Sequence, residues 1–233
     1  MNHSCAVTAC IAVLLMGVLC GCAVAPVQVA ESNTPRAIAQ GVEATPVQFS
    51  RIVTKLPLGE QIGQYQYGWG CLPGAVIGWR GGRLNVTDEE LVETFRKELQ
   101  TRNWPVVGDP YALFGDPASS GAEILVAGLV DKVDIRVCFP FSGSPNIDIG
   151  NTGTLKGGVF MQVSWQLYSR GANKVVYETT TQGSYRTEET VAGGLPVFLR
   201  NAFAANVRNL LADPGFYALV AKGRGRRPAG QDI

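Results

Sequence analysis

Hydrophobic and polar residues alternate along several segments of the chain, which is the pattern of half-buried β-strands. Residues 123–138 begin as an apolar run and then alternate valine and isoleucine with charged residues. Residues 157–169 alternate throughout, and a turn at 170–173 separates them from the β-branched and aromatic segment 174–186. The pattern therefore predicts a long strand followed by a long hairpin, and weaker alternation predicts a further strand within 47–57.

Two other segments repeat apolar residues every three or four positions, the period of an α-helix packed on a core. In the first, 85–104, Thr87 precedes Glu90 by three residues, which predicts a capping box. The second, 195–216, ends at an Asp-Pro-Gly sequence that stops a helix. The order of elements predicts one α+β domain over residues 47–220, with an antiparallel or mixed sheet and two helices packed on one face.

The segments that flank this domain have a different composition. Residues 22–46 are small and polar, with three prolines and no aromatic residue, which predicts a flexible tether. Residues 221–233 carry several arginines and predict a basic disordered tail. The whole chain has a formal net charge of +1, which argues against nucleic acid as its main partner.

The first 21 residues contain an apolar run from Ala6 to Leu19 in which Thr8 is the one residue that is not apolar, cysteine or glycine. As a helix this run rises about 21 Å, which is short of the roughly 30 Å hydrocarbon layer of a bilayer. Its length fits the apolar region of a secretory signal, although no Lys or Arg precedes it.

The run ends in Leu19-Cys20-Gly21-Cys22, which resembles the lipobox of bacterial lipoproteins. The resemblance implies that residues 1–21 are a lipoprotein signal peptide, that Cys22 receives a diacylglycerol, and that its freed amine is acylated. No acidic residue follows Cys22 directly, which resembles the pattern for outer-membrane delivery in enteric bacteria. We therefore expect an outer-membrane anchor with the domain in the periplasm, and an ordinary cleaved signal is the alternative.

Signal cleavage would also remove His3, the single histidine of the chain. The mature protein would then lack a histidine base and histidine metal ligands, so we expect no catalytic residue, metal or cofactor. Cys71 and Cys138 would remain as an even pair in an oxidising compartment, and a disulfide between them is favoured. Two separate buried thiols are the alternative, and a reactive thiol is least favoured because no histidine is present to activate it.

Three parts of the sequence together resemble bacterial envelope proteins: the lipobox, residues 90–109 (ELVETFRKELQTRNWPVVGD), and residues 163–186 followed by 202–216. They resemble a module that precedes the protease domain in some trypsin-like envelope proteins. More loosely, they resemble the lipoproteins of curli secretion and the activators of penicillin-binding proteins. Either resemblance implies a helper domain rather than a catalyst.

The leading hypothesis is therefore a non-enzymatic outer-membrane lipoprotein that serves as an accessory or assembly subunit and binds another envelope protein. Its oligomeric state stays open. Sheet edges and four aromatic residues would supply the interface: Tyr65, Tyr67, Trp69 and Trp79. Packing in the core is the favoured alternative for these four side chains.

Two further functions are weighed against this hypothesis. One is a periplasmic binding module for glycan, peptidoglycan or lipid, which would need a cleft lined by tryptophan and tyrosine. The other, least favoured, is a hydrolase with paired carboxylates, for which the candidates are Asp131 with Asp134 and Glu188 with Glu189.

Overall fold

The structure is a computed structural model that describes residues 27–81, 84, 86–108, 121–140 and 153–221. The predicted signal peptide, Cys22 and nearly all of the predicted basic tail lie outside the described residues. The described strands are β1 (Val47–Thr54), β2 (Gln61–Tyr67), β3 (Leu72–Gly78), β4 (Ile124–Phe139), β5 (Leu155–Ser169) and β6 (Lys174–Val191). The described helices are α2 (Asp88–Gln100), α3 (Gly194–Ala212) and α4 (Pro214–Ala221).

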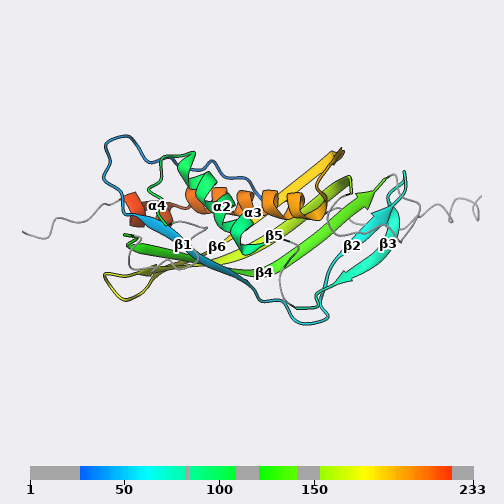
Figure 1. Cartoon of the computed structure of the whole chain (residues 1–233), viewed down its shortest axis with the longest axis horizontal. Coiled ribbons are helices and arrows are strands. Elements are labelled where there is room, and N and C mark those ends of the chain that lie inside the picture. The colour runs from blue at the N-terminus through cyan, green and yellow to red at the C-terminus, as the bar shows by residue number, and fades with distance from the viewer. Residues whose placement is uncertain (1–26, 82–83, 85, 109–120, 141–152, 222–233) are drawn as a thin grey trace, which may run out of the picture.

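The described strands form one six-stranded mixed sheet. The long strands β4, β5 and β6 are antiparallel neighbours, whereas β1 and β2 pair in parallel with the first and second halves of β4. β3 continues from β2 as an antiparallel hairpin at the edge. The helices cover one face of the sheet (Figure 1). This arrangement confirms the predicted single α+β domain with helices on one face.

The core lies between the helices and the sheet. The alternation predicted for β5 is confirmed from Met161 to Leu167, where the odd-numbered residues are buried, whereas Phe160 on the other face is also 0% exposed. From the helix side, Phe95 stacks on Phe49 at a ring-centroid distance of 4.7 Å. The predicted capping box starts α2: the Thr87 hydroxyl accepts from the Glu90 amide, and the Glu90 carboxylate accepts from the Thr87 amide. Each buried large apolar side chain contributes about 1.5–3 kcal/mol to stability.

A polar network crosses this apolar core. Trp165 Nε1 donates to the Thr181 hydroxyl at 2.8 Å, and that hydroxyl donates to Asn206 Oδ1 at 2.9 Å. Asn206 Nδ2 in turn donates to the Met161 carbonyl oxygen at 3.1 Å. Gly183 lets α3 approach this closely, because a Cβ there would lie 2.3 Å from a carbonyl oxygen of α3. The network therefore fixes where α3 sits on β5 and β6.

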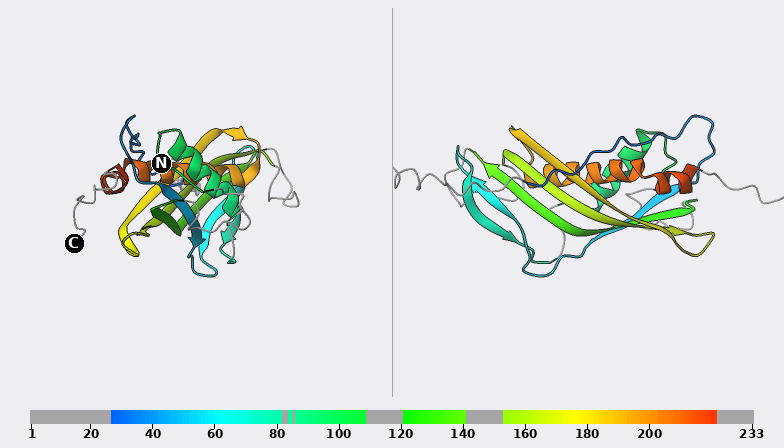
Figure 2. Two further views of the ribbon diagram at one scale, coloured as in Figure 1. Left: turned by 60° about the vertical axis from the view of Figure 1, so that its left-hand side comes forward. Right: turned by 180° about the vertical axis from the view of Figure 1, so that it is seen from behind.

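The segment 27–46, which we call the strap, runs along α3 and turns beyond α4 into β1 (Figure 2). Its residues Val27 and Ile38 are each 4% exposed. Its backbone is bonded to the domain, as where the Ala30 amide donates to Ser184 Oγ at 2.9 Å and the Thr45 amide to the Val220 carbonyl at 2.9 Å. The predicted flexible tether over 22–46 did not anticipate these contacts, because composition does not show which backbone groups find partners on the domain surface.

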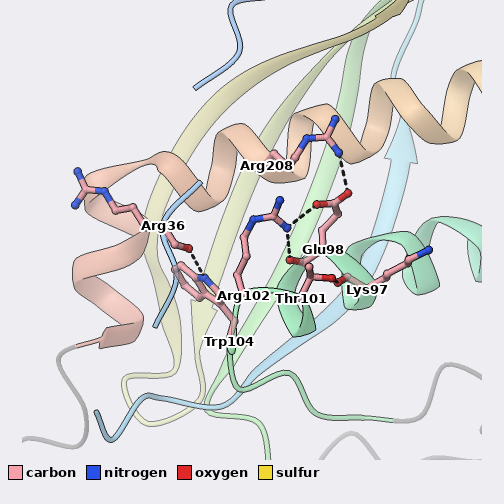
Figure 3. Close-up of polar contacts among 7 residues, drawn as sticks. All are labelled: Arg36, Lys97, Glu98, Thr101, Arg102, Trp104 and Arg208. Carbon is pink, nitrogen blue, oxygen red and sulfur yellow. Dashed lines mark hydrogen bonds and ion pairs between the residues drawn. The ribbon is translucent and has the colours of Figure 1, made fainter. Parts of the chain in front are cut away.

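Trp104 holds the middle of the strap. Its Nε1 donates to the Arg36 carbonyl at 2.8 Å, and its ring stacks on Phe216 of α4 at 5.0 Å. Figure 3 shows this bond beside two ion pairs of Glu98. Its Oε2 lies 2.8 Å from Arg102 Nη1, and its Oε1 lies 2.8 Å from Arg208 Nη1. The strap, α2 and α3 are thus tied together at one place.

We expect Trp104→Phe to loosen the strap without loosening the core. Phenylalanine keeps an aromatic ring for Phe216 but removes the N–H donor, and a net hydrogen bond is worth about 1 kcal/mol. Amide hydrogen exchange at Ile38, whose N–H donates to the Arg102 carbonyl, should then become about fivefold faster. Exchange of β5 amides serves as the control. An equal acceleration there, or none at Ile38, would contradict the assignment.

Within the described residues, no helix is both long and apolar enough to cross a membrane.

Candidate functional site

The hairpin of β2 and β3, residues 61–78, stands at the end of the sheet away from α4 (Figure 1). β3 is largely exposed on both of its faces. Leu72 is 69% exposed and Val76 is 58% exposed, and Trp69 in the hairpin turn is 82% exposed. Large apolar side chains gathered on an exposed edge are the kind of surface that marks a binding site.

Besides the pairing of β2 with β4, three contacts hold the turn of this hairpin to β4. Cys71 of the turn forms a disulfide with Cys138, with the two Cα atoms 5.4 Å apart. The Gly68 amide donates to the Phe139 carbonyl at 2.9 Å, and the Tyr67 ring stacks on the Phe139 ring at 5.7 Å. These contacts fix the turn beyond the point where the pairing of β2 with β4 ends.

The structure separates the four aromatic residues that the sequence grouped as an interface. Trp79 is 6% exposed and belongs to the core. Tyr65 and Tyr67 are half-buried against Phe139, and Trp69 projects into solvent. Burial, and secondarily the Tyr67 phenol, raise the pKa of Tyr65, so its hydroxyl stays neutral at physiological pH.

A basic pocket of about 340 Å³ lies beside the disulfide. It is on the sheet face turned away from the helices, since Arg136 alternates with the buried core residues of β4. Val27 of the strap and Trp69 line it together with three cations: Arg136, Lys156 and Arg186. Gly158 makes room for the strap there, because a Cβ on it would lie 2.5 Å from a Val27 methyl carbon.

Two of these cations have carboxylate partners. Arg136 Nε lies 2.9 Å from Asp134 Oδ1, and Arg186 Nη2 lies 2.7 Å from Glu188 Oε1. Lys156 forms no ion pair with any other residue that the structure describes. Sequence analysis missed this pocket because its cations come from three strands. Only the register of β4, β5 and β6 brings them together.

Three of the four carboxylates considered for hydrolysis accept hydrogen bonds or ion pairs, namely Asp131, Asp134 and Glu188, and Glu189 is exposed. Asp131 accepts from Gln162 Nε2 at 2.9 Å and from Ser164 Oγ at 2.6 Å. Asp134 and Glu188 form the ion pairs described above. Their contacts are those of a solvated surface network, which gives the paired-carboxylate hypothesis no geometric support. Among the described residues, no group of three or more His, Cys, Asp or Glu side chains is placed to hold a metal ion.

No protein-family model matches the sequence, and no curated protein matches it. Similar solved structures include protein XCC0632 of Xanthomonas campestris, of the DUF330 family, with 8% identity over 82% of this chain and 95% of that chain at a TM-score of 0.36. The C-terminal domain of LpoB from Salmonella enterica has 11% identity over 64% of this chain and 88% of that chain at a TM-score of 0.30. PelC from Paraburkholderia phytofirmans, described as a dodecamer, has 12% identity over 80% of this chain and 100% of that chain at a TM-score of 0.35.

At these identities and TM-scores, none of the likenesses carries an argument about function. None of the three descriptions names a trypsin-like protein, so that part of the resemblance gains no support.

Proposed function

We propose that this protein is a lipid-anchored, non-enzymatic accessory subunit of the bacterial envelope that binds another envelope protein along the outer edge of β3. The observation that carries the proposal is the exposure of this strand on both faces, with Leu72 and Val76 at 69% and 58%. Lipidated Cys22 would anchor the protein in the outer membrane, and the domain would work in the periplasm.

The partner would add an extended segment to β3 as a further strand. β3 pairs on one side with β2, and no described strand pairs with its other side. Seven residues give an edge of about 23 Å. The backbone groups of such an edge bind a strand, and the side chains on either face select it.

The sheet has three edge strands, β1, β3 and β6, which differ in how they are protected. Natural proteins block exposed edges with charged residues, proline or a covering segment. β6 carries five charged side chains and is crossed by the strap at Ser184. β3 has no charged residue, and Pro73 removes one backbone donor. β1 carries Arg51, and its Val47 bonds to Pro105 and Val107. β3 is the edge strand without a charged side chain, so we propose it as the edge that takes up a partner.

A ligand-binding module for glycan, peptidoglycan or lipid is the second candidate, and the basic pocket with Trp69 favours it. The pocket opens on the outer face of the sheet, whereas the protein-binding surface proposed above is the edge of β3. One domain can use both.

We expect Val76→Lys to abolish capture of the partner. A charge at this position opposes burial of the edge and is a common means of preventing strand addition. The measurement is formaldehyde crosslinking of intact envelopes, followed by affinity purification of the tagged mature protein in mild detergent. The variant should reduce recovery of the crosslinked partner at least tenfold.

The matched control is Val175→Lys, which changes a 42% exposed valine at the β5–β6 hairpin, the opposite end of the long strands. It should leave capture unchanged. Equal capture by the wild type and by Val76→Lys would overturn the β3 edge as the interface.

A further inference from the structure

We propose that the basic pocket binds the phosphate group of anionic lipids in the membrane that holds the anchor. The ligand is thus a lipid headgroup, and the pocket is where the domain rests on the bilayer. This inference rests on the proposed lipidation of Cys22.

The strap places the lipid attachment point beside the pocket. Val27 lines the pocket and is 4% exposed, and it follows Cys22 by five residues. Five extended residues span at most about 18 Å. The acyl chains on Cys22 therefore enter the bilayer within about 18 Å of Val27. A free tether ending at β1 would allow several times that distance, so the bound strap keeps the pocket close to the membrane.

The strap is held at this end by the domain itself. The space above Gly158 receives Val27, and Lys132 Nζ lies 3.4 Å from Gln28 Oε1. The Ala30 amide then donates to Ser184 on β6. These contacts lie on the outer face of the sheet, so the described strap begins on the same side as the pocket opening.

The lining of the pocket is suited to a phosphate. Three cations line the pocket with one carboxylate, that of Glu188. If the carboxylate of Asp134, the partner of Arg136, is counted as well, the site still has a net charge of +1. The ion pairs of Arg136 and Arg186 occupy only some of their N–H donors, and guanidinium groups bind phosphate through the remainder. Lys156 has no carboxylate partner among the described residues, so its ammonium is available as a point charge.

Trp69 gives a second reason to choose a lipid surface over a dissolved anion. The other three tryptophans are buried at 6%, 3% and 1% exposure, whereas Trp69 is 82% exposed at the rim of the pocket. Tryptophan is enriched at the membrane–water interface, where its ring lies among the headgroups. A dissolved phosphate would give such a ring no apolar surface to contact.

The test is sedimentation of the mature chain with vesicles, using Cys22→Ser so that no acyl chain contributes to binding. Vesicles of phosphatidylcholine containing 30% phosphatidylglycerol should bind the protein, and vesicles of phosphatidylcholine alone should not. Lys156→Glu should weaken binding at least tenfold. Trp69→Ser should also weaken it. The control is Lys174→Glu, which reverses an exposed cation at the far end of β6 and should leave binding unchanged.

Three results would overturn the proposal: equal binding to both kinds of vesicle, no binding to the anionic vesicles at low salt, or no effect of Lys156→Glu. Complete release by 10 mM inorganic phosphate would also overturn it, because the pocket would then be a site for a free anion. Val76→Lys should retain vesicle binding while it loses the partner protein. Failure of the β3 interface and failure of the lipid site are therefore separate outcomes.

Discussion

Loss of the Cys71–Cys138 disulfide is expected to lower the free energy of unfolding by about 4 kcal/mol, according to the chain-entropy model. The bond closes a loop between cysteines 67 positions apart, so it restricts a long stretch of the unfolded chain. It also ties the turn of the β2–β3 hairpin to the end of β4. The pairing of β2 with β4 ends at Tyr67, so the bond adds a covalent restraint on the turn that follows.

The measurement is urea unfolding of Cys71→Ser combined with Cys138→Ser, compared with the oxidised protein, both in the Cys22→Ser background. Reduction of the oxidised protein by dithiothreitol should reproduce the loss, and the double-serine variant should not respond to dithiothreitol. An unchanged urea midpoint in the variant would show that the disulfide adds nothing to stability.

The same restraint matters for the proposed function. Trp69 lies in the hairpin turn and the proposed protein-binding edge is β3, so both depend on the position of the hairpin. We therefore expect reduction to weaken partner capture and vesicle binding together, in contrast to Val76→Lys and Lys156→Glu, which should each affect one of them.

The elements that were predicted correctly are those whose signals are local. The alternation along β5 and the capping box of α2 each depend on residues close together in sequence, so a single segment is enough to recognise them. The parallel pairing of β1 and β2 with β4 joins segments about 75 residues apart, and no local pattern records it.

The candidate site was predicted less completely, and for the same reason. Cys71 and Cys138 were paired by counting cysteines, and Trp69 was named among four aromatics, but nothing in the sequence separated it from the buried Trp79. The cations of the basic pocket meet only through strand register. Val27 completes that pocket from a segment whose composition resembled a free linker. Its position depends on the absence of a side chain at Gly158, more than 100 residues later.

Asn206 is a further case in which a residue's role cannot be read from its type. In the sequence it is a polar residue within an apolar helix, yet its exposure is 0%. Its amide both donates and accepts, so it satisfies the Met161 carbonyl and the Thr181 hydroxyl at once. No unpaired nitrogen or oxygen is found among the buried side chains that the structure describes.

We expect Asn206→Ala to lower the free energy of unfolding by about 3–4 kcal/mol. The variant leaves a cavity and two buried polar groups without their partner, and an unsatisfied buried group costs about 1–3 kcal/mol. The effect is measured by urea unfolding. The control is Asn201→Ala, on the same helix, whose half-buried amide donates to the Val197 carbonyl one turn earlier. That change should cost less than about 1 kcal/mol.

Thr181→Val distinguishes the network from simple loss of volume. The variant keeps the shape of the side chain but breaks the chain of bonds between Trp165 and Asn206. If the network acts as a unit, either change alone already breaks it. The loss of stability in the combined Thr181→Val and Asn206→Ala variant should then be smaller than the sum of the two single losses, by about 1 kcal/mol or more. Additive losses would show instead that Asn206 acts through packing alone. The close fit of α3 at Gly183 would then be what positions the helix on the sheet.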